Sequence, residues 1–182
     1  MKIIAMIPAR LGSKRVKNKN LRLLGNKPLI SHVIETVKSS NVFDDIYINS
    51  ESEVFEKIAS QYDIKFYKRP EELSSDTATN DDFTLDFMKN VEGDLLIQVL
   101  STSPFITKEQ VISFVKKAKT VDTLISTKEV KIESIYKNKP INFDQLAQTP
   151  PSQLLEPINA YACSLMSWGY KNFIKNIEKY NA

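Results

Sequence analysis

Residues 3–12 read Ile-Ile-Ala-Met-Ile-Pro-Ala-Arg-Leu-Gly and set the fold of this chain. The run 3–7 is apolar without interruption, which is typical of a central strand in a parallel sheet that is covered on both faces. A basic loop follows the run directly, with Arg10 and Gly12 near its start. The stretch therefore predicts a buried strand whose carboxyl end leads into cationic groups.

Short apolar runs alternate with longer amphipathic runs along the rest of the chain, as expected of an α/β domain with a mostly parallel sheet. Further strands are predicted over 45–49, 64–67, 94–100, 123–126 and 160–166. Helices are predicted from about Pro28, over 52–62 and 81–90, behind Thr107, and over 170–180. Prolines interrupt the pattern over 128–157, which reads as an irregular excursion. Since no repeat or clear linker is present, we expect one domain over residues 1–182.

Three local features give finer expectations. In the helix 52–62, Val54, Ile58 and Tyr62 are predicted to point inward. Thr107 is followed three residues later by a glutamine, which is a capping-box pattern at the start of a helix. Cys163 lies in a predicted strand and reads as a small buried apolar residue.

The composition excludes several kinds of site. The 182 residues include 25 Lys and Arg, 22 Asp and Glu, one His and one Cys. His32 and Cys163 cannot build a Cys/His zinc site or an internal disulfide. The four glycines are too scattered to write either glycine-rich phosphate-binding motif. The net charge of +3 is too small to indicate a nucleic-acid partner by itself.

No apolar run approaches the roughly 20 residues that a membrane span needs. The apolar start of the chain is too short for a signal peptide, carries Pro8, and lacks a small-residue cleavage site. We therefore expect a cytoplasmic protein with no membrane partner.

Three polar segments follow predicted strands, over 9–20, 69–80 and 101–107. In open α/β sheets, ligands bind outside the carboxyl ends of the strands. If the sheet is parallel, these three segments converge on one edge and form the candidate site.

The segment 9–20 joins Gly12 to a run of cations that includes Arg10, Lys14 and Lys19. Glycine lets the backbone approach a ligand closely, and successive backbone amides in such a turn hold phosphate oxygens. The cations would neutralise a polyphosphate and the charge that develops as it is displaced. The alternative, a solvated basic loop, stays open on this spacing alone.

The same segment resembles the opening signature of the acylneuraminate cytidylyltransferase family. The matching residues are Ile7-Pro8-Ala9-Arg10, Gly12-Ser13-Lys14, Lys19-Asn20-Leu21 and Lys27-Pro28-Leu29-Ile30. The resemblance implies a Rossmann-like, three-layer nucleotidyltransferase domain that uses CTP and Mg²⁺ to activate sialic acids and related keto-sugar acids as CMP conjugates. It also implies that the loop wraps the triphosphate through Arg10, Gly12, Ser13, Lys14, Lys19 and Asn20. Arg10 and Lys19 are the predicted catalytic residues, which stabilise the transferring phosphate, with Lys14 on the leaving pyrophosphate.

The segment 69–80 resembles the family's segment at the nucleotide base. On that resemblance Arg69, the backbone at Ala78, and Asn80 face the cytosine. The alternative is a plain turn before a capped helix, which Ser75, Asp76 or Asn80 would also favour.

The segment 101–107 is a weaker match. Thr102 and Ser103 resemble a stretch that lies beside the sugar and phosphates in the family, and Asn159 resembles an asparagine before the returning strand. Leu100 stands where a glutamine is frequent, but Gln98 lies two residues earlier and points to the same face of an extended strand. These four polar residues are the predicted substrate-binding set, and a plain strand-to-helix loop is the alternative.

The chain departs from the family at several points. Arg15 and Lys17 replace a frequent glycine and proline in the basic loop. The sequence shows no equivalent of the family's metal-binding acidic pair, so the ligands of the expected Mg²⁺ are not identified. It also shows no clear match for the basic residues that receive the sugar carboxylate.

Three alternatives to a sialic acid-type transferase stay open, and the first two follow from these departures. The chain could be a cytidylyltransferase for a different acceptor, or a nucleotide-binding homologue with impaired catalysis. A nucleic-acid binder would use the basic stretch 10–22, which lacks the interleaved aromatic residues that stack on bases. We expect CTP and a small sugar acid as partners and no nucleic acid, and the resemblance suggests that 128–157 is the arm of a homodimer.

Overall fold

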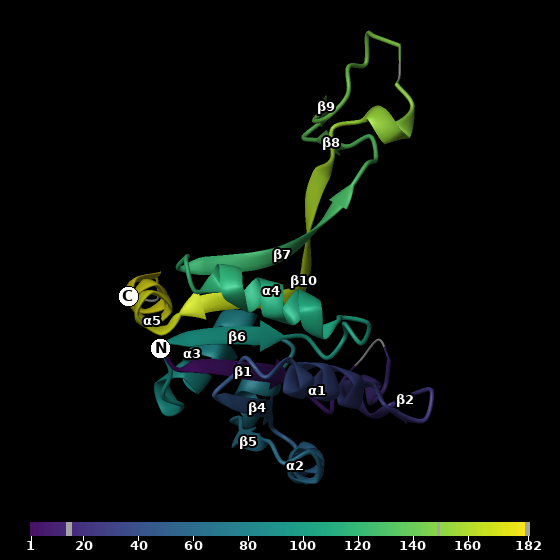
Figure 1. Ribbon diagram of the computed structural model, residues 1–182. Helices are drawn as coiled ribbons and strands as arrows, with labels where there is room; N and C mark the ends of the chain where they lie inside the picture. Colours follow the sequence, from purple (N-terminus) through teal and green to yellow (C-terminus); the bar gives the residue numbers. More distant parts are fainter. Residues whose placement is uncertain (14–15, 149, 181–182) are drawn as a thin grey trace. The chain divides into compact units, whose positions relative to one another are not determined.

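Strand β1 (Ile3–Pro8) runs through the middle of a six-stranded sheet in the computed structural model (Figure 1). The structure describes residues 1–13, 16–148 and 150–180. The strand order is β5-β4-β1-β6-β10-β7. The other strands of this sheet are β4 (Asp45–Ser50), β5 (Lys65–Lys68), β6 (Leu95–Val99), β7 (Thr123–Val130) and β10 (Ile158–Gly169). β5, β4, β1 and β6 are parallel, whereas β10 pairs antiparallel with β6, so the predicted mostly parallel sheet is confirmed.

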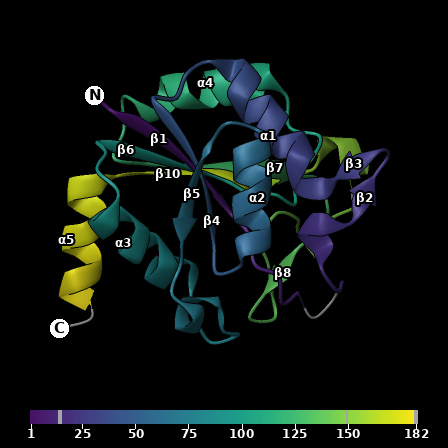
Figure 2. The same ribbon diagram turned by 90° about the horizontal axis from the view of Figure 1, so that it is seen from below.

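Helices cover both faces of β1, which explains why its run is apolar throughout. The helices are α1 (Leu29–Ser40), α2 (Glu53–Gln61), α3 (Asn80–Asn90), α4 (Lys108–Ala118) and α5 (Tyr170–Tyr180). Ile3, Ala5 and Ile7 are buried against α1, α2 and α4. Ile4 and Met6 face the other way, against α3 and α5, which lie side by side (Figure 2). These are the three layers of the expected α/β architecture.

Side-chain caps begin two of the helices around the candidate site. The Thr107 capping box is confirmed, with Gln110 as its partner at the start of α4. A second box begins α3, where Thr79 Oγ1 accepts from the Asp82 backbone N–H and the Asp82 carboxylate accepts from the Thr79 N–H. The cap of α3 is therefore Thr79, not Ser75, Asp76 or Asn80, because only the residue directly before the first turn can reach the N–H of its third residue.

Two local predictions are wrong. Val54 is 42% exposed, whereas its neighbour Phe55 is fully buried and Ile58 is buried with it. Positions 54 and 55 both fit a helical spacing to 58, and packing against the sheet selects the larger side chain. Cys163 is half-buried rather than buried, and its φ of 53° places it in the left-handed region.

The chain divides into two compact units, which are Met1–Leu124 with Ser164–Ala182, and Ile125–Cys163. The second unit holds most of β7, the first half of β10 and the predicted irregular excursion 128–157. Within it lie the short hairpin of β8 (Ile135–Tyr136) and β9 (Lys139–Pro140), and one 3-10 turn, η3 (Ser152–Leu154). The expectation of one domain over 1–182 stays a prediction.

Over the described residues, none of the helices combines the length and apolar character that a membrane crossing would require.

Candidate functional site

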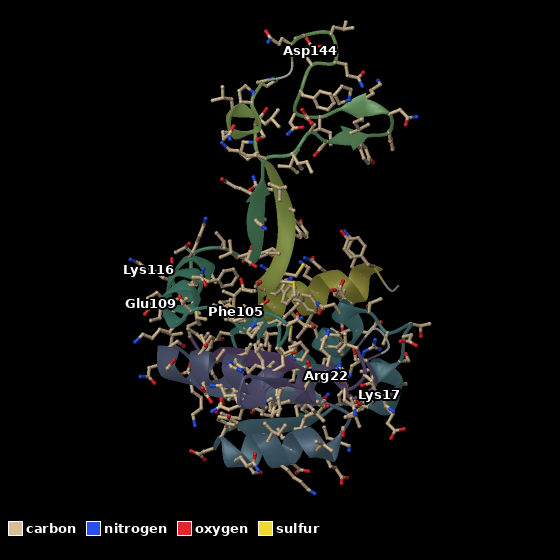
Figure 3. The ribbon with its side chains drawn as sticks, turned by 90° about the vertical axis from the view of Figure 1, so that its right-hand side faces the viewer. Lys17, Arg22, Phe105, Glu109, Lys116 and Asp144 are labelled. Atoms are coloured by element: carbon tan, nitrogen blue, oxygen red, sulfur yellow. The ribbon has the colours of Figure 1, made fainter. Side chains whose placement is uncertain are left out.

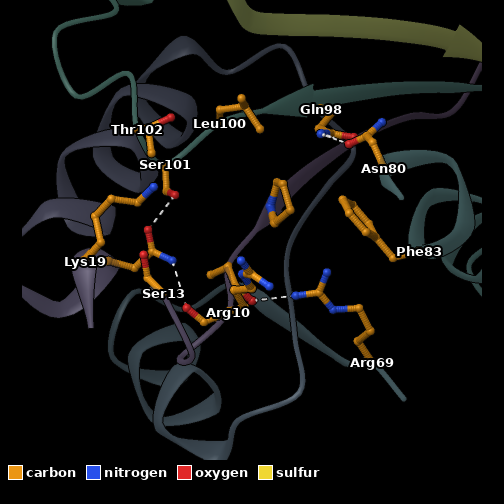
Figure 4. Close-up of a pocket in the computed structure, with 13 residues that line it drawn as sticks. Arg10, Ser13, Lys19, Arg69, Asn80, Phe83, Gln98, Leu100, Ser101 and Thr102 are labelled. Atoms are coloured by element: carbon orange, nitrogen blue, oxygen red, sulfur yellow. Dashed lines mark hydrogen bonds between the residues drawn. The ribbon is translucent and has the colours of Figure 1, made fainter. Parts of the chain in front are cut away.

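A cavity of about 570 Å³ opens at the carboxyl ends of β1 and β6 in the first unit (Figure 4). Its lining residues are Pro8, Ala9, Arg10, Ser13, Lys19, Asn20, Arg69, Asn80, Phe83, Gln98, Leu100, Ser101 and Thr102. The volume is within the range that small-molecule sites occupy. All three polar segments contribute to the lining, so their predicted convergence on one edge of the sheet is confirmed.

Most of the predicted site residues meet in this cavity. Arg10, Ser13, Lys19, Asn20, Arg69, Asn80, Gln98 and Thr102 line it. Gly12, Ala78 and Ser103 are not in the lining, and the Ser103 hydroxyl instead pairs with that of Ser164 at 2.9 Å. Lys14 lies outside the described residues, and Asn159 belongs to the second unit.

The sequence reading missed Phe83 and Ser101 as site residues. Phe83 lies three residues after Asn80 on α3, so the two share one face of the helix. That spacing was the available signal for its place in the site. Ser101 lies two residues after the end of β6 and directly before Thr102, and its position close to a strand end was a signal of the same kind.

Arg69 is a buried cation at one wall of the cavity. Its guanidinium donates to the Ala9 carbonyl at 2.8 Å and lies 3.5 Å from the Glu51 carboxylate. It also lies over the Phe83 ring, 4.7 Å from the centroid, which is a cation–π geometry. Burial lowers the pKa of Arg69 and Glu51 opposes that shift. Arginine remains charged in proteins, so a permanent cation lies against the face of the Phe83 ring.

Arg10 links the first polar segment to the second. Its Nη1 lies 3.3 Å from the carbonyl oxygens of Ser74 and Ser75 and 3.3 Å from Asp76 Oδ1. The Arg10 side chain is more than a third exposed, so the ion pair with Asp76 is screened by solvent. The contact therefore serves mainly to hold the loop after β1 beside the segment 74–76.

Asn20 anchors the same loop to the end of β6. It follows Lys19 in the 3-10 turn η1 (Lys19–Leu21) and is 5% exposed. Its Nδ2 donates to the Arg10 carbonyl at 3.3 Å, and its Oδ1 accepts from the Ser101 hydroxyl at 2.8 Å. Both ends of the buried amide are thus bonded to the walls of the cavity, and Lys19 is held at the cavity edge.

A short chain of amides lies at the opposite side of the cavity. Gln98 is fully buried, yet its Nε2 donates to Asn80 Oδ1 at 2.6 Å and its Oε1 accepts from Thr84 Oγ1 at 3.3 Å. The predicted role of Gln98 in binding substrate stays a prediction, since in this structure both groups of its amide are bonded to neighbours.

The two sides of the cavity therefore differ in chemistry. Arg10 and Lys19 place positive charge on the side of the loop after β1, whereas Phe83 offers an aromatic ring and Asn80 an amide on the other, with the Arg69 guanidinium over the ring (Figure 4). The first side suits phosphate groups, and the second suits a flat heterocycle with hydrogen-bonding edges.

The lining itself offers little to a metal ion. None of the lining residues is a carboxylate, and the nearby Glu51 and Asp76 are each paired with an arginine. Nowhere in the described ranges do three or more His, Cys, Asp or Glu residues gather as a metal site. The described lining residues therefore do not fit a metal held by the protein alone, and Mg²⁺ stays a prediction.

The family model described as "Cytidylyltransferase" matches residues 4–149, which is most of the chain. The chain belongs to the cytidylyltransferase family. The matched range includes every described residue that lines the cavity.

Two relatives show what this cytidylyltransferase-family chain is similar to. It is 32% identical over 179 residues to an N-acylneuraminate cytidylyltransferase of Escherichia coli, which covers 96% of this chain and 39% of the relative. It is 37% identical over 117 residues to a CMP-N,N'-diacetyllegionaminic acid synthase of Legionella pneumophila, which covers 61% of this chain and 50% of the relative. The resemblance to acylneuraminate cytidylyltransferases is thereby confirmed, although the chain spans half or less of the length of these two relatives.

A solved structure confirms the fold of this family member. A CMP:2-keto-3-deoxy-manno-octonic acid synthetase in complex with CTP superimposes with a TM-score of 0.77. The superposition covers 98% of this chain and 78% of that chain, at 16% identity. The nucleotidyltransferase fold, Rossmann-like and three-layered, is therefore confirmed.

Proposed function

We propose that this chain transfers CMP from CTP to a hydroxyl group of a sugar acid and releases pyrophosphate. The observation that carries the proposal is the cavity, with cations on one side and an aromatic ring with an amide on the other. Membership of the cytidylyltransferase family supports the type of reaction. The relatives named for N-acylneuraminate and for diacetyllegionaminic acid support an acidic sugar as the acceptor.

In this proposal the nucleotide lies across the cavity. The triphosphate occupies the side of the loop after β1, where Arg10 and Lys19 lie and where Lys14 and Gly12 belong to the same loop. The base occupies the side of Asn80 and Phe83, with Arg69 behind the ring. This orientation matches each part of CTP with the side of opposite charge or similar polarity.

The reaction forms one bond and breaks one. The acceptor hydroxyl oxygen bonds to the α-phosphorus of CTP, the bond from that phosphorus to the bridging oxygen breaks, and pyrophosphate leaves. The hydroxyl proton passes to solvent. Such a transfer depends mainly on positioning and on neutralising charge. Arg10 and Lys19 are proposed to stabilise the phosphate in transfer, while Thr102 and Ser103 are proposed to bind the acceptor.

Pyrophosphate release in the presence of Mg²⁺ tests the proposal. Each of the four common nucleoside triphosphates is combined with each of a panel of keto-sugar acids, including N-acetylneuraminic acid. We expect pyrophosphate release with CTP and one of the acids. We also expect mass spectrometry to detect the corresponding CMP conjugate as the product. Release without an acid, or with a triphosphate other than CTP, would contradict the proposed reaction.

The second candidate function is nucleotide binding without transfer. It is favoured because none of the described residues that line the cavity is a carboxylate. Calorimetry separates the two functions. CTP binding with no pyrophosphate release across the whole panel would support the alternative. Oligonucleotide binding that CTP does not displace would instead support a nucleic-acid partner.

We also propose that the chain forms a homodimer through its second unit. Within the described part of that unit, several large apolar side chains are exposed, and exposed apolar surface of this kind is typical of an interface. They include Ile132, Ile135, Tyr136, Ile141, Leu154 and Tyr161. Sedimentation analysis of the chain tests this proposal, and a monomer at high concentration would contradict it.

A further inference from the structure

Three hydrogen-bonding side chains form a relay that ends at the cavity. Thr84 on α3 donates its hydroxyl to Gln98 Oε1 at 3.3 Å. Gln98 on β6 then donates its Nε2 to Asn80 Oδ1 at 2.6 Å, and Asn80 lines the cavity (Figure 4). Thr84 and Gln98 both have no exposed surface.

Gln98 is an unusual residue for its position. β6 reads Leu-Leu-Ile-Gln-Val, and all five side chains are buried. Burying an amide costs free energy unless its groups are bonded, whereas an aliphatic residue like its neighbours would cost nothing. Both of its groups are directed to Thr84 and Asn80, so the amide is placed to hold those two side chains rather than to fill the core.

The relay sets which way the Asn80 amide faces. Because Gln98 Oε1 accepts from Thr84, the Gln98 nitrogen must face Asn80. Asn80 must then turn its oxygen toward Gln98, since two amide nitrogens would both be donors. The Asn80 Nδ2 consequently has both of its N–H groups left over, and among the described residues it has no hydrogen-bond partner.

The geometry points to Thr84 and Gln98 as positioning residues that make Asn80 a hydrogen-bond donor toward the base and thereby select cytosine over uracil. Cytosine presents an acceptor at N3, whereas uracil presents an N–H donor there. A donor held at Asn80 opposite N3 bonds to cytosine, whereas uracil would place its N3–H donor against it. The carbonyl O2 is common to both bases, so the selection rests on the N3 position. This inference rests on the proposed function, which places the base at the Asn80 side of the cavity.

The opposite orientation of the relay would reverse this preference. If the Thr84 hydroxyl accepted from Gln98 rather than donating to it, Gln98 would present its oxygen to Asn80. Asn80 would then present its own oxygen to the base and would match the N3–H of uracil. Loss of the Thr84 hydroxyl, or of the Gln98 amide, releases Asn80 to adopt either orientation.

Calorimetric titration of the purified chain with CTP and with UTP tests the inference. The readout is the ratio of the two dissociation constants, which needs no acceptor sugar and no turnover. In the wild type we expect tighter binding of CTP. In Thr84→Val and Gln98→Met, which keep the side-chain size and remove the relay, we expect the preference for CTP to fall by about tenfold.

Two further variants serve as controls. Thr84→Ser keeps the hydroxyl, and we expect it to retain the CTP preference to within about twofold. Thr36→Val removes a comparable hydroxyl bond, from Thr36 Oγ1 to the His32 carbonyl in α1, away from the cavity, and should leave the preference unchanged. Circular dichroism establishes that each variant is folded, and the Thr84 pair remains decisive if Gln98→Met does not fold.

Each outcome bears on the inference. An unchanged CTP preference in folded Thr84→Val overturns it, and so does an equal loss of affinity for both nucleotides, which marks a merely structural role. A wild type that binds CTP and UTP alike also overturns it. If the relay variants lose the CTP preference but the wild type releases no pyrophosphate, the inference is supported and the proposed transfer is contradicted. The failure of the inference can therefore be told apart from the failure of the proposed function.

Discussion

The Ser101 hydroxyl donates to Asn20 Oδ1 at 2.8 Å across 81 positions of sequence. This bond joins the loop after β1 to the end of β6, and both residues line the cavity. Asn20 is 5% exposed and Ser101 is 4% exposed, so the bond is shielded from water. The shape of the phosphate side of the cavity therefore depends on a contact between two different strand ends.

Removing this bond should weaken nucleotide binding. In Ser101→Ala the buried Asn20 oxygen loses a donor, and we expect the KM for CTP to rise by about tenfold because the loop after β1 is held less firmly. Steady-state pyrophosphate release measures this change. Ser40→Ala is a matched control, since Ser40 is also buried and, among the described residues, its hydroxyl bonds to the Val37 carbonyl in α1. An equal effect of the two substitutions would contradict a role for the Ser101 bond.

Lys19 should matter for turnover far more than for folding. We expect Lys19→Ala to lower kcat by about a hundredfold or more, because it removes a charge proposed to stabilise the transferring phosphate. Lys17→Ala is the control, since Lys17 is exposed on the same loop (Figure 3). An unchanged kcat in Lys19→Ala, or a comparable loss of kcat in Lys17→Ala, would contradict a catalytic role for Lys19.

The cap of α3 should make stability depend on pH. The Asp82 carboxylate accepts from the Thr79 backbone N–H and hydroxyl, each at 2.7 Å, and these bonds lower the pKa of Asp82 below its ordinary value. A lowered pKa gives stability that is present above the unfolded-state pKa, about 3.9, and is lost as pH falls through the folded-state value. We expect Asp82→Ala to cost about 0.5–1 kcal/mol at pH 7.

Urea unfolding at a series of pH values measures this dependence. The difference in stability between wild type and Asp82→Ala should narrow as pH falls below about 4. Asp81→Ala controls for the charge at the same helix end, because Asp81 is also in the first turn but is not the capping-box residue. A difference that stays constant down to the lowest pH would rule out the ionised carboxylate as its source.

Gly93 should tolerate no side chain. A Cβ at this position would lie 2.8 Å from Ile4 Cγ1 and 2.8 Å from the Tyr170 ring, both of which are buried. We expect Gly93→Ala to lower the free energy of unfolding by about 1–3 kcal/mol, because the core on that face cannot absorb the extra group. Gly12→Ala is the comparison, since beyond its chain neighbours no atom of the described residues lies within 4 Å of its added Cβ. Equal stability of the two variants in chemical denaturation would show that the core yields at Gly93.

Several features of the fold were predictable because they depend on local sequence. The apolar run of β1 requires cover on both faces, and the structure provides it. The Thr107 box was predictable because its partner lies within one turn. The antiparallel direction of β10 was not predictable, because the amino-acid sequence of a strand does not determine which neighbouring strand it pairs with.

The candidate site was predictable in its residue types more than in its contacts. The polar segments after β1, after β5 and after β6 could be expected to meet, because carboxyl ends of parallel strands share one edge of a sheet. Their internal bonds could not be expected. Arg69 carries no sequence signal that it is buried beside Glu51 or stacked on Phe83, and those contacts join three separate elements of the fold.

By itself, the sequence determined the class of the fold, the position of the cationic loop and the resemblance to acylneuraminate cytidylyltransferases, because each depends on residue types at short spacings. Only the tertiary structure decided that Asn20 bonds to Ser101 and that Gln98 bonds to Asn80. Those contacts depend on how β1, β6 and α3 pack. The free energy of that packing comes from residues throughout the core, so no single segment of sequence determines it.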